Sequence, residues 1–290
     1  MPVRIAIVGP GRVGRAFASR FCRASADVLG FVGRDEASAE AAARATGCGA
    51  ALGWSDLARA HCVVFSVGDG QLGDAVAAAA AAGGRPCSLW LHTSGRHDLA
   101  VFDAAASLGV RAGSLHPLAP FPGSLDDPPI SGAPAVCQGA EESRELLGRL
   151  CEMLQLEPVF VGEQNRALYH AACALAANGA TALFGLAAET LRAAGGLRSE
   201  DAARVVAALM SAAAAGSAEH GAAAALSGPV RRGDDATVAL HLEELSKHAP
   251  SAEPAYRALM ARAVHLAAAE GLPEDARQRL EQLLRGGGGR

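Results

Sequence analysis

The sequence predicts an α/β protein in which a doubly wound parallel sheet of the Rossmann type is followed by an all-helical domain. A glycine-rich turn, Gly9 to Gly14, directly follows an apolar strand-like run at the start of the chain. Further apolar runs alternate with helical patterns up to Val161, after which nearly every segment is helical in pattern. We therefore predict two domains, a dinucleotide-binding domain over 1–162 and a helical domain over 163–290.

Composition narrows the class of protein. The chain has 290 residues, 50% of them hydrophobic, which is enough for two folded domains. A formal net charge of -4 gives no basic surplus, so we expect a small-molecule substrate and no nucleic-acid partner. The seven cysteines include no CxxC pair, which favours reduced thiols and indicates no metal site. The chain does not start with a signal-peptide pattern, and the run Ala75–Ala82 is too short to cross a bilayer, so we expect a soluble cytoplasmic protein and no membrane partner.

The elements are expected in alternation along the first domain. Strands are expected at residues 3–8, 28–32, 62–67, 88–91, 110–115, 133–137 and 158–161. Helices are expected at residues 13–24, 36–46, 98–108 and 141–154 and in the alanine-rich segment after Gly70, with Asp69 as its cap. The second domain is expected to hold helices at residues 167–194, 199–215, 235–247, 254–270 and 274–284. An irregular passage is expected at Pro117, Pro120, Pro122, Pro128 and Pro129, and a disordered end at Gly286–Gly289.

The turn after the first strand has the pattern of a dinucleotide site. In a strand, turn and helix of this kind, Gly9 permits the turn, Gly11 lets a pyrophosphate approach the backbone, and Gly14 lets the helix pack on the strand. Glycine-rich turns also occur in purely structural corners. The cofactor residues predicted here are Gly9, Pro10, Gly11, Arg12, Val13 and Gly14, together with Val67 and Gly68 after a later strand.

The second strand ends in Gly33-Arg34-Asp35, where the adenosine ribose of a cofactor would lie. An acid there accepts the ribose hydroxyls of NAD, whereas an arginine pairs with the 2′-phosphate of NADP. Because Arg34 comes first, we predict NADP, with NAD as the alternative that Asp35 keeps open. The two charges also fit a solvated turn before the next helix.

Two polar residues follow later strands, where ligands of such sheets bind. Ser94 and His116 each stand just past the end of a strand. Hydride transfer needs a group that moves a proton, and histidine suits this because its unperturbed pKa is about 6.5. The alternatives are a histidine that caps a strand end and a turn hydroxyl that satisfies the local backbone.

The first long helix of the second domain carries Tyr169, His170 and Asn178. His170 and Asn178 would lie about 80° apart on a regular α-helix, so one broad face can present both. We expect Asn178 in the catalytic site and Tyr169 and His170 in the substrate pocket, although a histidine on such a helix is often a satisfied core residue.

A loop between helices, Ser227 to Asp234, carries two adjacent arginines. Arg232 would clamp a carboxylate or phosphate, and Asp234 would either line the same pocket or cap the next helix. The alternative is that both arginines of the loop are simply exposed to solvent and bind no ligand.

These motifs occur in one order over essentially the whole chain, namely the glycine turn, His92–Gly95, Leu115–Leu118, Tyr169–Ala172 with Asn178, Ser227–Pro229, Arg232–Asp234, Thr237 and His241–Leu242. Together they resemble the bacterial Rossmann-like proteins with a helical carboxyl-terminal domain of unknown function. The superfamily that this implies includes pyrroline-5-carboxylate reductase, 6-phosphogluconate and 3-hydroxyacid dehydrogenases, ketopantoate reductase and prephenate dehydrogenase, which are usually dimers with a helical second domain.

The resemblance bears differently on three residues. Prephenate dehydrogenases carry a serine and a His-Pro pair similar in type and spacing to Ser94 and His116-Pro117. Hydroxyacid dehydrogenases use a Lys-x-x-x-Asn pair, and here Ala174 stands four residues before Asn178. Their particular proton transfer is therefore not implied.

The leading hypothesis is an NADP-preferring oxidoreductase that transfers a hydride between nicotinamide and a small, carboxylated metabolite. The candidate reactions within this class are reduction of a ketopantoate-like carbonyl and reduction of an imine. His116 would be the acid, base or anchor, with Ser94 and Asn178 positioning the substrate. The alternative from another class is a dinucleotide-binding sensor or partner-binding protein without catalysis. We expect a homodimer formed through the helical domain.

Overall fold

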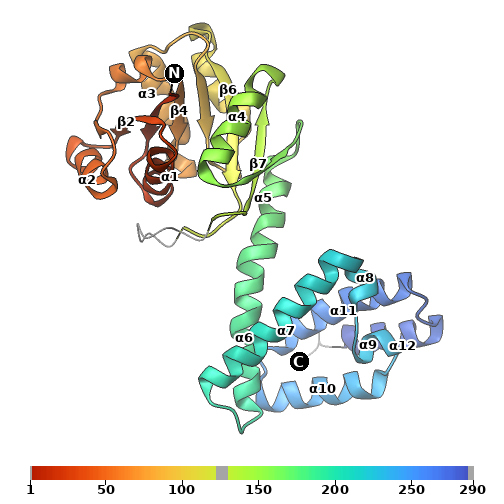
Figure 1. Cartoon of the computed structure of the whole chain (residues 1–290). Coiled ribbons are helices and arrows are strands. Elements are labelled where there is room, and N and C mark those ends of the chain that lie inside the picture. The colour runs from red at the N-terminus through yellow and green to blue at the C-terminus, as the bar shows by residue number, and fades with distance from the viewer. Residues whose placement is uncertain (1, 122–129, 287–290) are drawn as a thin grey trace. The chain divides into compact units, whose positions relative to one another are not determined.

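The computed structural model describes residues 2–121 and 130–286 (Figure 1). The chain divides into two compact units, Met1–Ala172 and Cys173–Arg290. This division falls inside the helix α5 (Arg166–Ala174), whereas the sequence led us to expect a boundary near Gly162. The expected irregular passage at Pro122, Pro128 and Pro129 and most of the glycine tail, from Gly287 on, lie outside the described residues.

The first unit is built on one eight-stranded sheet with the strand order β3-β2-β1-β4-β5-β6-β7-β8. The strands are β1 (Arg4–Val8), β2 (Asp27–Val32), β3 (Ala50–Ala51), β4 (Cys62–Phe65), β5 (Leu89–His92), β6 (Arg111–Pro117), β7 (Pro134–Gly139) and β8 (Glu157–Phe160). The first six form the parallel order of a dinucleotide-binding sheet. β7 runs antiparallel to β6 and β8 is parallel to β7. The predicted Rossmann-type class is thus confirmed, with one antiparallel pair added.

Helices cover both faces of this sheet (Figure 1). One face packs against α1 (Arg12–Arg23), α2 (Glu36–Thr46) and α4 (Glu141–Leu154). The other face packs against α3 (Leu72–Ala82) and the 3-10 segments η1 (Trp54–Arg59) and η3 (Leu99–Leu108). Side chains alternate along a strand, so Ile5 and Ile7 of β1 enter the first core, and Ala6 and Val8 enter the second.

The chain differs from expectation where β4 meets α3. β4 ends at Phe65. The amide of Ser66 still donates to the carbonyl oxygen of Val8 at 2.8 Å, and the Ser66 hydroxyl donates to the carbonyl oxygen of Gly9 at 2.9 Å. A short 3-10 turn, η2 (Asp69–Gln71), then precedes α3, so Asp69 does not cap that helix as expected. Residues 99–108 form a 3-10 rather than an α-helix, and Asp98 caps it by accepting from the amide of Ala100 at 3.1 Å.

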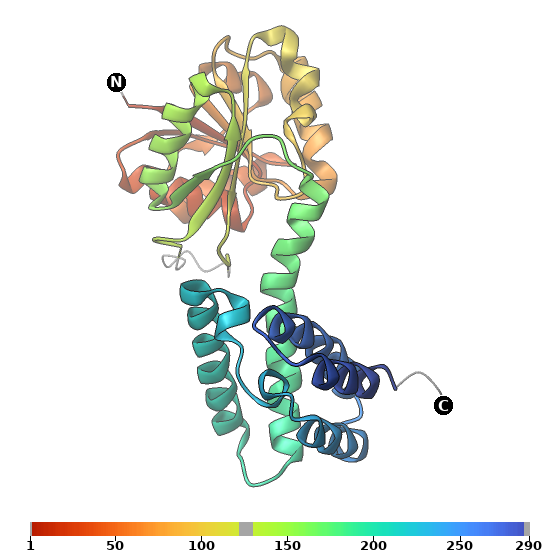
Figure 2. The ribbon, with the colours of Figure 1, turned by 90° about the vertical axis from the view of Figure 1, so that its right-hand side faces the viewer.

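The second unit is helical, as predicted. Its elements after α5 are the π-helical segment η4 (Leu175–Gly179), α6 (Ala180–Ala193), α7 (Ser199–His220), α8 (Ala222–Ala225), α9 (Pro229–Arg232), α10 (Asp235–His248), α11 (Glu253–Ala269) and α12 (Glu274–Arg285), which Figure 2 shows from the side. Val238, Val264 and Leu280, from three different helices, are fully buried in its core.

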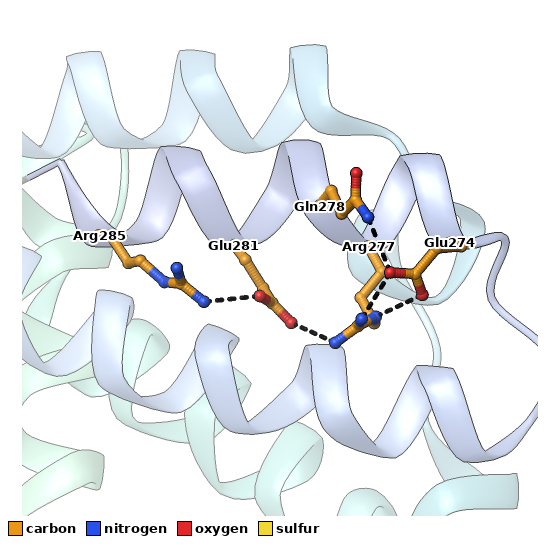
Figure 3. A network of polar contacts seen from close by, with 5 residues as sticks. All are labelled: Glu274, Arg277, Gln278, Glu281 and Arg285. Atoms are coloured by element: carbon orange, nitrogen blue, oxygen red, sulfur yellow. Dashed lines mark hydrogen bonds and ion pairs between the residues drawn. The ribbon is translucent and has the colours of Figure 1, made fainter.

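The helix α12 illustrates how these helices divide their faces. Its buried face carries Leu280 and Leu284, while its outer face carries a chain of polar contacts (Figure 3). Arg277 donates to Glu274 and to Glu281 at 2.9 Å, and Arg285 donates to Glu281 at 2.7 Å. Pairs at this helical spacing stabilise an exposed face by only tenths of a kcal/mol each, so burial of the leucines fixes the position of the helix.

Candidate functional site

The three glycines of the turn differ in what surrounds them. Gly9 has φ +105°, and a Cβ there would lie 2.8 Å from the carbonyl group of Ser66. A Cβ at Gly14 would meet the carbonyl oxygen of Gly9, and the hydroxyl of Ser66 at 2.6 Å. A Cβ at Gly11 would have no described atom within 4 Å. Only the middle glycine therefore borders open space.

That space is a cavity of about 620 Å³ in the first unit. It is lined by the turn residues Gly9, Pro10 and Gly11, by the end of β2 with Arg34, and by Val67, Gly68 and Gln71. α1 begins beside it with Gly11 as its N-cap and no acid in its first turn. Free N–H groups and the positive end of the helix therefore make this wall suitable for phosphate.

The two charged residues after β2, Arg34 and Asp35, have different roles. The carboxylate of Asp35 accepts from the amide of Ser38 at 2.8 Å and caps α2. This hydrogen bond, followed by one from the Ser38 side chain, holds the pKa of Asp35 below its usual value. Arg34 lines the cavity and is exposed. Asp35 is therefore a helix cap, a role that we did not predict for it from the sequence, while Arg34 and Asp74 are charged residues that line the cavity.

His116 and Tyr169 form a pair within the first unit. The Nδ1 atom of His116 lies 2.7 Å from the Tyr169 hydroxyl, and the two rings meet edge to face at 5.7 Å between centroids. Gly95 lies against the imidazole, because a Cβ there would be 2.7 Å from its Cε1 and 2.9 Å from its Nε2. A glycine after the Ser94 turn is therefore required for this ring to occupy its place.

The surroundings of His116 keep it neutral at pH 7. Burial is the main cause, and the charges of Arg166 and His170 add to it, so the pKa of His116 falls to about 4 against a weaker opposing effect of Asp69. An imidazolium then makes up only about one part in a thousand at pH 7. The unperturbed histidine pKa of about 6.5 therefore does not apply at this position.

Ser94 is 8% exposed, and its hydroxyl oxygen accepts from the amides of Arg96 at 3.1 Å and His97 at 3.2 Å. This is the turn hydroxyl that the sequence offered as the alternative. Its lone pairs hold the loop after β5 in shape, and its O–H remains a donor.

Sequence reasoning missed Arg166, a 5%-exposed arginine in the first turn of α5. Its Nε donates to the carbonyl oxygen of His97 at 2.8 Å and its Nη2 to that of Ser94 at 3.2 Å. The guanidinium also lies 5.1 Å above the Tyr169 ring. The available signal was an arginine three residues before Tyr169, at the start of an otherwise apolar helix.

Asn178, Arg232 and Asp234 belong to the second unit, whereas His116 belongs to the first. Asn178 is exposed within the π segment η4, which adds a residue to the turn, so the 80° spacing from His170 expected of a regular α-helix does not apply. Asp234 caps α10 by accepting from the amide and hydroxyl of Thr237 at 3.0 and 2.7 Å. Arg232 is exposed and lowers the pKa of Asp234, after the larger effect of Thr237.

The family comparisons divide the chain into two parts. A model of a Rossmann-like domain matches residues 2–117, which end with β6, and a model of a domain of unknown function (DUF2520) matches residues 133–264. The second match begins at β7 and so includes the part of the sheet that departs from the parallel order. Among curated proteins none matches significantly.

Solved structures share the fold over nearly the whole chain. A Thermotoga maritima protein is 20% identical, with a TM-score of 0.67 over 92% of this chain and 99% of its own. A reductive aminase from Aspergillus terreus, solved with NADPH and ethyl-5-oxohexanoate, is 16% identical, with a TM-score of 0.61 over 98% and 93%. A pyrroline-5-carboxylate reductase from Coxiella burnetii is 13% identical, with a TM-score of 0.61 over 98% and 99%. At these identities the likeness establishes the fold.

Proposed function

The chain combines a Rossmann-like domain with a DUF2520 domain, and we propose that it is a dinucleotide-dependent oxidoreductase. The observation that carries the proposal is the cavity at Gly11, where the turn leaves room beside the amino end of α1 while its other two glycines are filled by their neighbours. A pyrophosphate needs both the room and the free N–H groups. The reductase and aminase of the same fold support the assignment.

NADP is the preferred cofactor in this proposal, with NAD as the weaker ligand. Arg34 offers a guanidinium at the cavity wall, which suits a 2′-phosphate. The carboxylate of Asp35 caps α2, so it is engaged where an NAD-binding acid would be needed for the ribose hydroxyls. The Aspergillus terreus relative was solved with NADPH.

The proposed chemistry uses His116 and Tyr169 as a proton-donating pair. The bound dinucleotide supplies or accepts the hydride. With the imidazole neutral, Nδ1 accepts from the Tyr169 hydroxyl, which leaves Nε2–H to donate to the oxygen or nitrogen of the substrate. As Nε2 gives up its proton, Nδ1 takes the proton of the Tyr169 hydroxyl, which leaves a neutral imidazole and a phenolate. The Arg166 cation over the Tyr169 ring stabilises the negative charge that develops on the phenol oxygen.

The substrate in this proposal is a small, carboxylated metabolite with a carbonyl or imine carbon, or the corresponding alcohol or amine. Within the first unit, Ser94 would position it, and Tyr169 and His170 would contribute to its binding. Ketopantoate-like carbonyls and cyclic imines are the two groups to screen, since the related folds include a pyrroline-5-carboxylate reductase and a reductive aminase.

Fluorescence titration with NADPH and NADH tests the first step, and a screen of oxo-acids and cyclic imines for NADPH oxidation tests the second. We expect NADPH to bind more tightly and at least one class to be turned over. A His116→Ala variant should lose turnover of that substrate while it still binds NADPH. Failure of both nucleotides to bind at sub-millimolar concentration would remove the proposal.

A non-catalytic dinucleotide sensor is the second candidate. The surroundings of Ser94 and His116 favour it. The Ser94 hydroxyl oxygen already accepts hydrogen bonds from two backbone amides, and the low pKa of His116 makes its imidazole a weak base. A sensor would bind NADPH with no turnover across both substrate groups, and His116→Ala would not change its binding.

We further propose a cytoplasmic homodimer formed through the helical unit. Among the described residues one helical stretch, Arg166–Ala193, has 28 residues, a mean hydropathy of 1.5 and no buried residue in its most apolar window, so by length and composition it could also cross a membrane. Leu175 and Leu209 are 76% and 65% exposed. Apolar patches of this kind mark interfaces.

Light scattering on the purified chain tests the dimer. We expect twice the monomer mass, lost in the double variant Leu175→Glu/Leu209→Glu and kept in Val159→Glu, which alters an exposed apolar residue of the first unit. Recovery of the protein only from the membrane fraction would contradict the proposal.

A further inference from the structure

The edge of the sheet opposite the glycine turn carries a second cavity, of about 320 Å³. The parallel strands β1, β4, β5 and β6 all begin at this edge, since Ile5, Cys62, Leu89 and Arg111 are neighbours in register. β1, β4 and β5, with four or five residues each, separate it from the dinucleotide cavity by roughly 15 Å. The two cavities are therefore distinct.

Three arginines line this second cavity and no acid does. They are Arg85 before β5, Arg111 at the start of β6, and Arg149 on α4. Within residues 2–121 and 130–286 these three form no ion pair, although neighbouring arginines such as Arg144 do. Asp27 acts on His61, and Glu142 contributes its backbone carbonyl to Arg111. Glu145 and Glu152 stand one helical turn from Arg149 on α4, but neither lines the cavity.

One of these guanidiniums is already held in place. Arg111 donates through Nε to the carbonyl oxygen of Cys87 at 3.1 Å and through Nη1 to that of Glu142 at 2.8 Å. Arg85 begins a turn in which the amide and hydroxyl of Ser88 donate to its carbonyl oxygen at 3.1 and 2.6 Å. The arginines at the cavity are thus presented by fixed backbone, which lowers the entropy lost when they bind a ligand.

The side chains of His61 and Arg4 present hydrogen-bond donors, which indicates that a ligand here would be an acceptor. The Nδ1 of His61 accepts from the amide of Arg4 at 3.0 Å, so a neutral ring carries its proton on Nε2. The Nη2 of Arg4, also a donor, lies 3.4 Å from that Nε2. Two donors cannot bond to each other, and an acceptor placed beside both would satisfy both. Burial, Arg4 and Arg85 lower the pKa of His61, as expected in a positive field.

We propose that this cavity, with Arg85, Arg111, Arg149 and His61 as its donors, binds a phosphoryl dianion of a small metabolite. Guanidinium groups pair with phosphate oxygens through two parallel hydrogen bonds, and a dianion balances more of the three positive charges than a monocarboxylate does. The site is independent of the proposed redox reaction, since no residue is shared with the dinucleotide cavity.

The test follows the ring signal of His61 by NMR in the full-length protein, assigned through His61→Gln. Inorganic phosphate and pyrophosphate are titrated at constant ionic strength, in the presence of saturating NADPH so that the glycine turn is occupied. We expect a saturable shift and a rise in the His61 pKa, with acetate and chloride giving neither. Should NADPH fail to bind, the same titration without it still decides the matter.

Arg111→Gln and Arg149→Gln should each weaken phosphate binding about tenfold or more, because each removes a charge-assisted pair. Arg149 is exposed, so its variant should fold normally. Arg144→Gln is the matched control on the same helix and should bind as the parent does. Equal binding by the Arg149 and Arg144 variants, or an equal shift with chloride, would overturn the proposal.

Discussion

Replacing Gly11 and Gly14 by alanine separates a ligand effect from a packing effect in one turn. At Gly14 the added methyl would meet the carbonyl oxygen of Gly9 and the Ser66 hydroxyl at 2.6 Å, and backbone cannot move aside cheaply. Overpacking of this kind costs about 1–3 kcal/mol or more, and the gain of about 1 kcal/mol from alanine in a helix offsets only part of it. We expect a net loss of about 2 kcal/mol.

At Gly11 the balance is close to zero. Its φ of -75° suits any residue, and a Cβ there has no described atom within 4 Å. Alanine is a poorer N-cap than glycine by a few tenths to about 1 kcal/mol, whereas the smaller entropy of the unfolded chain returns about 0.4–1 kcal/mol. Stability should change by less than about 0.5 kcal/mol, but the methyl occupies the approach to the amino end of α1, so NADPH affinity should fall at least tenfold.

Thermal unfolding by circular dichroism and fluorescence titration with NADPH measure the two effects. A loss of 2 kcal/mol corresponds to a Tm about 4–8 °C lower for a unit of this size, against a shift of at most about 2 °C for Gly11→Ala. If Gly11→Ala lowers the Tm as much as Gly14→Ala, or binds NADPH as the parent does, the assignment of room at Gly11 to a phosphate is refuted.

Three further substitutions test the rest of the site. Arg34→Gln should weaken NADPH at least tenfold and NADH little, because only NADPH carries the 2′-phosphate; equal losses in titrations of the two nucleotides would contradict the role of Arg34. Tyr169→Phe should lower kcat on any substrate found by about tenfold or more with NADPH binding unchanged, whereas Tyr256→Phe, which breaks a similar 2.8 Å contact to His241 in the second unit, should leave kcat unaltered. Burial, with the charge of Arg166, lowers the pKa of His92 to about 4 from 6.5. As the pH drops from 6.5 to 4 the unfolded chain therefore binds this proton before the folded chain does, and the free energy of unfolding falls by at most about 3 kcal/mol. Urea unfolding of His92→Gln across that pH range should show a smaller fall, and a fall equal to that of the parent would count against a neutral buried His92.

The parts of the structure that depend on local pattern were predictable from the sequence. Hydrophobic periodicity predicts the alternation of strands and helices and the helical second unit. The glycine turn is predicted by residues such as Gly9, whose backbone conformation other residues rarely adopt. The antiparallel β7 was not predictable, because an apolar run has the same pattern in either direction. The low pKa of His116 was not either, because it arises from burial and from Arg166, fifty residues further along the chain.

Arg166 accounts for several features of the His116 site. Its guanidinium holds the carbonyl oxygens of Ser94 and His97, which fixes the loop where Gly95 supports the imidazole of His116. The same positive charge lowers the pKa of His116 and faces the ring of Tyr169. A cation that shapes the loop also disfavours an imidazolium beside it. The residue that builds the candidate site therefore restricts its chemistry to a neutral histidine, and any proton delivered there at pH 7 has to be replaced through a partner such as Tyr169.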